Sequence, residues 1–232
     1  MKKSFLAILL CAAAAVPAVA ATADQRLAES TAVLKDIMAK SEIPQGAWDK
    51  SRCVLVYPSV KKIAVGFGQS YGRGVLVCRS GANFNGPWGA PVMYTLDNSS
   101  LGVQLGSSAT DYVLLVITER GANKILSGKL KLGADAAAVA GPTGANASGF
   151  NDPSIDILSY SQSKGLFAGA SLGTASMAAD DKINMQLYGD AVDAAAMVRA
   201  GTTSIPSDAK PLVALLTKIS PAYATRRLAV VP

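Results

Sequence analysis

Apolar positions follow two different periods along this chain. Over residues 24–40 they recur at the spacing of one helix face, which predicts an amphipathic helix. Over residues 63–172 the apolar runs are short and separated by glycine, proline, asparagine and serine, as in antiparallel strands. Residues 190–200 and 207–218 return to helical spacing. The pattern therefore predicts an α+β fold: a mainly antiparallel sheet, as a sandwich or partly closed barrel, with the N-terminal helix and C-terminal helices flanking it.

The individual elements can be placed from the same pattern. We expect the first helix to be capped by Thr22, with Gln25 three residues later, and a short helical turn carrying Trp48 to follow Pro44. A further short helical piece is expected near residues 122–126. The predicted strands are residues 53–57, 63–68, 73–78, 91–96, 100–106, 111–117, 129–133 and 164–173.

Glycines spaced four residues apart mark three of these segments. They are Gly68 and Gly72; Gly102 and Gly106; and Gly165, Gly169 and Gly173. Because their neighbours alternate with period two, we interpret them as strands with one nearly bare face, whereas a membrane helix needs about 20 consecutive apolar residues. The glycines either mark bulges and turns, allow another layer to pack closely, or leave room for a ligand.

The N-terminus predicts export. Two lysines, an apolar stretch and the small-residue site Ala18-Val19-Ala20 indicate a secretory signal peptide at residues 1–20. Residues 21–232 are then expected to form a single domain, located in the periplasm or outer envelope of a Gram-negative bacterium. Removing Lys2 and Lys3 lowers the formal charge from +6 to +4, which favours anionic surfaces without implying nucleic acid.

The remaining cysteines and the absence of histidine limit the chemistry. Cys53 and Cys78 lie in strand-like runs that either pair to form a disulfide or bury two apolar thiols. Without histidine, His-dependent catalytic triads and His-ligated metal sites are excluded. The S-x-x-K pattern at residues 59–62 and 161–164 lacks its partner motifs, and carboxylates are scattered. We therefore predict no enzyme activity, no metal and no cofactor.

Basic residues and aromatic residues give the candidate binding site. Lysines and arginines follow the N-terminal helix and the first strands, close in sequence to Trp48, Tyr57 and Tyr71, and aromatic rings of this kind lie at lipid headgroup boundaries. An ordinary solvated rim over the core would show the same residues. The residues predicted to contact lipid are Lys35, Lys40, Lys61, Lys62, Arg73 and Trp88.

Several segments, in this order, resemble the SYLF domain family. They are the apolar run ending at Pro58, then GFGQSYGRGVLVCR (66–79), GPWGAP (86–91), LGVQLG (101–106), LGAD (132–135) with AGP (140–142), and YSQSKGLFAG (160–169). The resemblance implies a lone lipid-binding or membrane-binding domain with no known enzyme activity. Eukaryotic relatives are associated with phosphoinositides, often through a basic N-terminal helix, and some bind actin.

These observations predict a non-catalytic envelope protein that binds anionic phospholipids or fatty acyl chains at a membrane surface. Either the basic residues contact headgroups, or the bare glycine faces leave an apolar cavity inside the sheet for an acyl chain. An actin partner is not expected, because the leader directs the chain out of a cytoplasm. The alternative is a structural or assembly protein whose small-residue sheet faces bind a protein partner.

Overall fold

The computed structural model describes residues 22–40, 43–65, 67–100, 105–143, 150–165, 175–189 and 193–223, and the predicted leader lies outside them. The helices are α1 (Ala23–Lys40), α2 (Gln45–Asp49), α3 (Glu119–Leu126), α4 (Asp181–Tyr188), α5 (Ala194–Ala200), the 3-10 turn η1 (Ser207–Ala209) and α6 (Lys210–Ile219). The strands are β1 (Cys53–Val65), β2 (Phe67–Cys78), β3 (Val92–Ser100), β4 (Leu105–Val116), β5 (Leu130–Lys131), β6 (Ala138–Ala140), β7 (Ile157–Gly165) and β8 (Ser176–Ala179).

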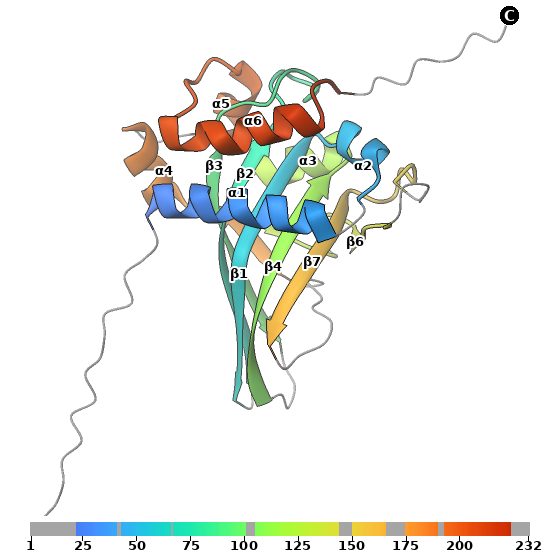
Figure 1. The fold of residues 1–232 in the computed structure, drawn as a ribbon, viewed down its shortest axis with the longest axis vertical. Helices are drawn as coiled ribbons and strands as arrows, with labels where there is room; N and C mark the ends of the chain where they lie inside the picture. Colours follow the sequence, from blue (N-terminus) through green and yellow to red (C-terminus); the bar gives the residue numbers. More distant parts are fainter. Residues whose placement is uncertain are drawn as a thin grey trace, which may run out of the picture.

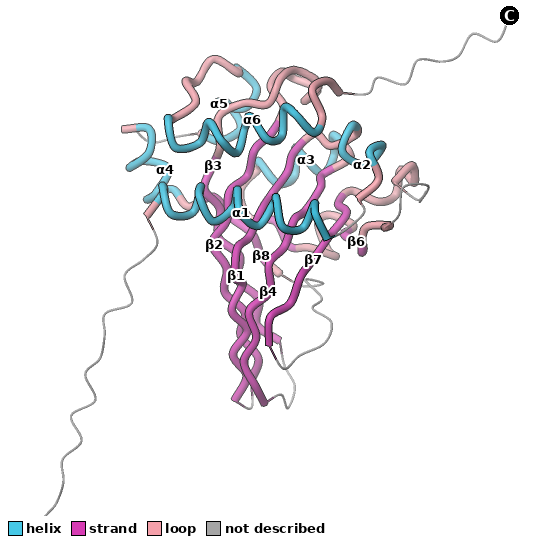
Figure 2. Tube along the Cα trace, viewed as in Figure 1, coloured by secondary structure: helices cyan, strands magenta, loops and turns pink. Residues whose placement is uncertain are grey.

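One curled sheet forms the centre of the fold (Figures 1 and 2). Its eight strands have the order β5-β8-β3-β2-β1-β4-β7-β6, and every pair is antiparallel except β6 with β7. Helices from the N-terminal and C-terminal parts of the chain flank this sheet, so the α+β prediction is confirmed. The distal ends of β1 and β4 extend beyond the helical layer, at the bottom of Figure 1.

Alternating strand residues divide the core between the two faces of the sheet. Val54 and Val56 belong to the cluster under α1, α2, α4 and α6, whereas Cys53 and Leu55 belong to the cluster under α3 and α5. The predicted capping of α1 is confirmed, because Thr22 and Gln25 exchange hydrogen bonds of 3.1 and 3.3 Å.

A bulge divides β1 into two parts. The pairing register shifts between Tyr57 and Val60, and Ser59 adopts a φ of 46° there. The Ser59 amide donates a 2.7 Å hydrogen bond to the buried carboxylate of Asp111 on β4. The segments at residues 53–57 and 63–68, predicted as separate strands, are therefore one bent strand that ends at Val65, followed by the start of β2.

Other element boundaries also differ from the prediction. The strand predicted at residues 111–117 is not separate: residues 111–116 are the second half of β4, which already begins at Leu105. A helix outside the predicted set, α4, begins at Asp181, because the Asp180 side chain caps it by accepting a hydrogen bond from the Ile183 amide. Asp180 also forms a 2.7 Å ion pair with buried Arg26 of α1, which connects the two helices.

Gly72 and Gly74 of β2 serve close packing. A Cβ at Gly72 would lie 2.8 Å from a Val60 methyl group, and one at Gly74 would lie 2.4 Å from the Val56 carbonyl oxygen. The curled sheet thus fills the space above these glycines with the side chains of β1. The expected cavity inside the sheet, and a bare small-residue face for a partner, are both absent at these two positions. Gly102, Gly169 and Gly173 lie outside the described residues.

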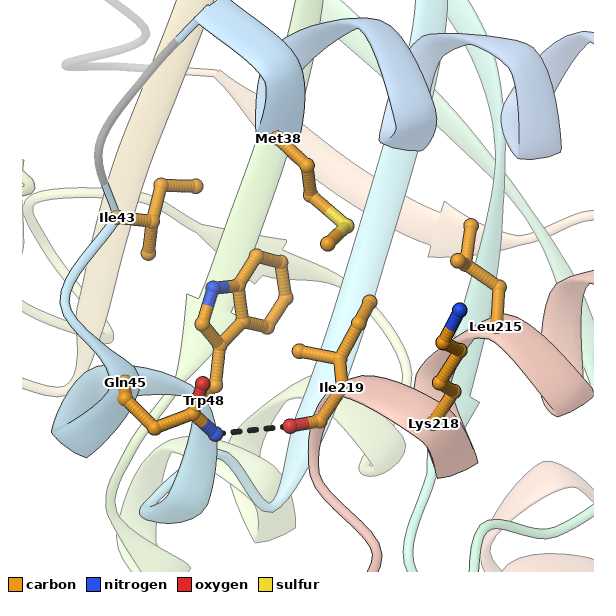
Figure 3. A pocket seen from close by; sticks show the side chains of 7 residues that line it. All are labelled: Met38, Ile43, Gln45, Trp48, Leu215, Lys218 and Ile219. Atoms are coloured by element: carbon orange, nitrogen blue, oxygen red, sulfur yellow. Dashed lines mark hydrogen bonds between the residues drawn. The ribbon is translucent and has the colours of Figure 1, made fainter.

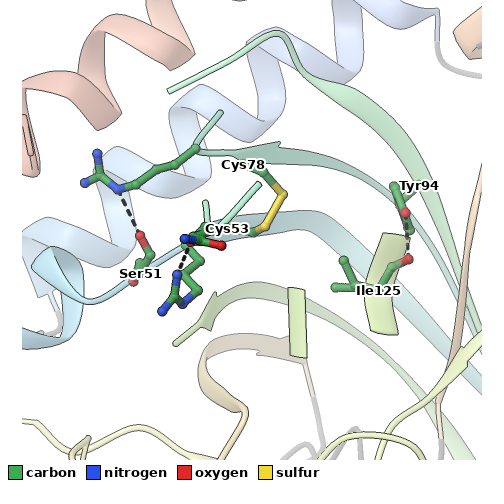
Figure 4. Close-up of a disulfide and its surroundings, with 8 residues drawn as sticks. Ser51, Cys53, Cys78, Tyr94 and Ile125 are labelled. Atoms are coloured by element: carbon green, nitrogen blue, oxygen red, sulfur yellow. Dashed lines mark hydrogen bonds between the residues drawn. A yellow bond between two sulfur atoms is a disulfide. The ribbon is translucent and has the colours of Figure 1, made fainter. Parts of the chain in front are cut away.

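A disulfide joins Cys53 and Cys78 at the base of the β1–β2 hairpin (Figure 4). The two residues are directly paired, with Cα atoms 3.9 Å apart, and both are buried. On the same face, the buried Tyr94 hydroxyl donates a 2.8 Å hydrogen bond to the carbonyl of Ile125 in α3. This end of the hairpin is therefore held both covalently and by the helix packed on it.

Candidate functional site

The ends of α1 and α6 enclose an apolar pocket with α2 (Figure 3). Its volume is about 390 Å³. The walls come from three parts of the chain: Met38, Ile43, Gln45, Trp48, Leu215, Lys218 and Ile219. In Figure 3 the Trp48 indole occupies the centre, between the side chains of α1 and those of α6. Trp48 is only 3% exposed, so the ring forms the floor of the pocket.

The polar groups of this pocket have different environments. The Gln45 amide nitrogen donates 2.8 Å hydrogen bonds to the Ile219 carbonyl and to Asp49, which fixes α2 against the end of α6. Lys218 is exposed and has no ion pair or hydrogen bond with any described residue, and the Trp48 indole N–H likewise has no acceptor among them. The pocket therefore combines apolar walls with one available cation and one available donor.

A shallower groove of about 490 Å³ lies on the other side of α6. Ile205, Val213 and Ala214 supply its apolar surface, while Lys210 and Lys218 stand at its edge. Lys218 therefore borders both hollows. The exposed face of α6 therefore presents one cation, Lys218, between two apolar depressions.

A second candidate surface lies on the α1 side of the sheet, beyond the helices. Lys61 of β1 is exposed and pairs with Tyr71 of β2, which is 41% exposed. The Arg73 guanidinium lies 5.3 Å from the centre of the Tyr71 ring and donates a hydrogen bond to its hydroxyl. Exposed Asp97, paired with Tyr71 on β3, adds one negative charge to the same row. We call Lys61, Tyr71 and Arg73 the hairpin face.

The pairing of β1 continues beyond Lys61 as far as Val65, which pairs with Phe67 of β2 and with Leu105 of β4. Within the described ranges, every helix is too short or too polar to cross a membrane.

The other predicted lipid contacts are dispersed. Lys35 and Lys40 are exposed on α1, where Lys40 forms a 2.8 Å ion pair with Asp36. Lys62 pairs with Ser70, and its side chain is outside the described part of the chain. Of the predicted set, the structure brings Lys61 and Arg73 together around Tyr71.

The prediction for Trp88 needs correction. Its side chain is 4% exposed, its indole N–H donates a 2.9 Å hydrogen bond to the Ser220 carbonyl, and its ring lies 4.2 Å from the Arg79 guanidinium. Arg79 is itself buried and donates to carbonyl oxygens of Ser51, Gly86 and Ser220. Burial lowers the pKa of Arg79 to about 10, so the residue is charged at neutral pH. Trp88 therefore anchors the end of α6 and is not available to a lipid surface.

Carboxylates in the described ranges do not gather into a metal site. Asp156, the most connected of them, is buried and accepts hydrogen bonds from Thr118, the Arg120 guanidinium and the Ala137 amide. These contacts connect the loop before β7 to the start of α3. The arrangement is structural, as expected for a carboxylate surrounded by donors.

Sequence reasoning missed the pocket because its walls are far apart in the chain. Trp48 was expected in a short helical turn, and residues 207–218 were expected to form a separate helix. No spacing in the sequence connects residues near 45 with residues near 217. The Gln45 hydrogen bond to Ile219, which brings the two segments together, arises only in the folded chain.

Comparison with known proteins identifies the family of this chain. Residues 97–219 match the Ysc84 family, described as "Las17-binding protein actin regulator". The chain therefore belongs to the Ysc84 family, the family of the SYLF domain, and the predicted resemblance is confirmed.

The curated relatives are much longer than the segment that matches this chain, and the names of two of them include an SH3 domain. The SH3 domain-containing protein PJ696.02 of Schizosaccharomyces pombe is 30% identical over 167 residues, which is 70% of this chain and 38% of that protein. Protein YSC84 of Saccharomyces cerevisiae is 29% identical over 163 residues, 68% of this chain and 34% of that protein. The human SH3 domain-containing YSC84-like protein 1 is 27% identical over 155 residues, 66% of this chain and 44% of that protein. The chain thus matches less than half of the length of each.

Proposed function

We propose that this chain is a non-catalytic lipid-binding protein that attaches to anionic membrane surfaces through the hairpin face. The observation that carries the proposal is the grouping of Lys61, Tyr71 and Arg73 on an uncovered part of the sheet. Two cations beside an exposed tyrosine suit the headgroup region of an anionic bilayer, because the charges attract phosphates while the ring tolerates both water and lipid.

A further cation lies on the same side of the sheet as the hairpin face. Lys35, exposed on the outer side of α1, lies on the same side of the sheet and adds to the attraction.

The location that we propose is the bacterial envelope, in agreement with the leader expected at residues 1–20. Anionic phospholipids are the available charged lipids in such a compartment. A protein partner is the second candidate, and the description of the family as Las17-binding and actin-regulating favours it. We propose that actin binding does not extend to this chain, so cosedimentation with filamentous actin is expected to leave the protein in the supernatant.

Vesicle flotation tests the proposal. The mature protein is expected to float with vesicles that contain phosphatidylglycerol at low salt, and to float less at high salt because ions screen the attraction. The double substitution Lys61→Gln and Arg73→Gln removes two charges that contribute about 1 kcal/mol each, so affinity should fall about thirtyfold.

A matched control removes the same charge elsewhere. Lys124 and Lys129 are exposed on the α3 side of the sheet, so the substitutions Lys124→Gln and Lys129→Gln should leave flotation nearly unchanged. Equal losses in both double variants would mean that net charge alone attracts the protein. No flotation of the unmodified protein with anionic vesicles would exclude membrane binding by this surface.

A further inference from the structure

The pocket between α1, α2 and α6 is separate from the hairpin face and has a different chemistry. The hairpin face is flat and charged, whereas the pocket is concave and mostly apolar. A volume of about 390 Å³ is towards the lower end of the range for small-molecule sites, about 300 to 1,000 Å³. The space therefore suits one slender ligand.

We infer that this pocket binds a single fatty acid, with its carboxylate at Lys218 and its chain over Trp48. Five of the lining side chains are apolar or aromatic: Met38, Ile43, Trp48, Leu215 and Ile219. Lys218 is the one cation among the lining residues, which include no carboxylate. The lining thus matches a molecule with one negative end and an apolar remainder.

The local contacts leave Lys218 available for that role. Lys40, the other lysine near the end of α1, is paired with Asp36, whereas Lys218 has no partner among the described residues. The Gln45 side chain is already committed to Asp49 and Ile219, so it shapes the wall and leaves the charge to Lys218. The Trp48 indole N–H, which has no acceptor in the described chain, is a further donor for an oxygen atom or a water that enters with the ligand.

The inference rests on the proposed lipid-binding function. It places an acyl chain between helices, whereas the sequence suggested a cavity inside the sheet. Close packing fills the sheet interior at Gly72 and Gly74. Among the described residues no side chain fills the helical pocket, and its floor is the large flat ring of Trp48.

Titration with dodecanoate below its micelle concentration tests the site without any membrane. Calorimetry on the mature protein should show saturable binding. Lys218→Gln is expected to weaken it about fivefold, since an exposed ion pair contributes up to about that factor. Lys210→Gln on the same helix, at the edge of the other groove, is the matched control and should bind like the unmodified protein.

A brominated dodecanoate identifies the contact. Bromine quenches tryptophan only at close range, so fluorescence should decrease as the ligand saturates, and the decrease should persist in Trp88→Phe, which leaves Trp48 as the single tryptophan. Absence of binding, binding without quenching of Trp48, or equal weakening by Lys210→Gln would overturn the assignment. Vesicle flotation of Lys218→Gln should equal that of the unmodified protein, so failure of the pocket and failure of the hairpin face are separate results.

Discussion

Removing the Cys53–Cys78 disulfide is expected to destabilise the protein strongly. The bond closes a loop of 25 residues between the start of β1 and the end of β2. Without it, the unfolded chain gains conformations that the cross-link forbids, while the folded hairpin keeps its pairing. The perturbation that isolates this effect is reduction of the unmodified protein, because it changes no side-chain volume apart from two hydrogens.

The size of the effect follows from the loop length. The chain-entropy relation for a closed loop gives about 3.5 kcal/mol at 25 °C for a separation of 25 residues. Domains are stable by only about 5 to 15 kcal/mol, so the loss is a large part of the total. Both cysteines are buried at 0% and 1% exposure, so reduction should need partial unfolding or a strong reductant.

Urea unfolding with and without reductant measures the difference. The midpoint of unfolding should move to a lower urea concentration in the presence of reductant. The shift in midpoint multiplied by the slope of the transition should give a loss of about 3.5 kcal/mol in the free energy of unfolding. The double variant Cys53→Ala and Cys78→Ala is the control, since reductant should not shift its midpoint. A shift of the unmodified protein below about 1 kcal/mol would refute the loop-entropy reasoning.

Three further outcomes are expected. Gly74→Ala should cost about 2 kcal/mol in urea unfolding, because its Cβ would lie 2.4 Å from the Val56 carbonyl oxygen, and an unchanged midpoint would contradict this. Asp97→Asn removes the negative charge beside the hairpin face and should tighten binding to anionic vesicles up to about fivefold, but leave binding to neutral vesicles unchanged. Burial raises the pKa values of Tyr112 and Tyr160 to about 12. Both hydroxyls therefore stay protonated in the folded protein at pH values above about 10, at which they ionise in the unfolded chain. Stability should therefore fall between about pH 10 and 12, and Tyr112→Phe with Tyr160→Phe should reduce that fall.

Local sequence determined much of the fold. The helical stripe of residues 24–40 and its cap at Thr22 depend on neighbours within one or two turns, and the structure contains both. The α+β class followed in the same way from short apolar runs between turn residues. The family resemblance rested on several short segments in a fixed order, and the family match over residues 97–219 confirms it.

Strand boundaries were less predictable where long-range contacts decide them. A bulge held by Asp111 joins two predicted strands into β1, although Asp111 is 52 residues from Ser59. The start of α4 depends on Asp180, which the ion pair with Arg26 and the hydrogen bond to Ile183 hold in place. The distant partners, Asp111 for Ser59 and Arg26 for Asp180, cannot be read from the sequence around these residues.

The sequence by itself determined which residue types are available for function: no histidine, few carboxylates, and basic residues near aromatic ones. Only the tertiary structure decided how they are used. It groups Lys61 and Arg73 around Tyr71, buries Trp88 against Arg79, and brings Lys218 to the pocket that contains Trp48. The physical reason is that composition sets the chemistry of side chains, whereas exposure and proximity depend on strand register and on helix packing between segments that are far apart in the chain.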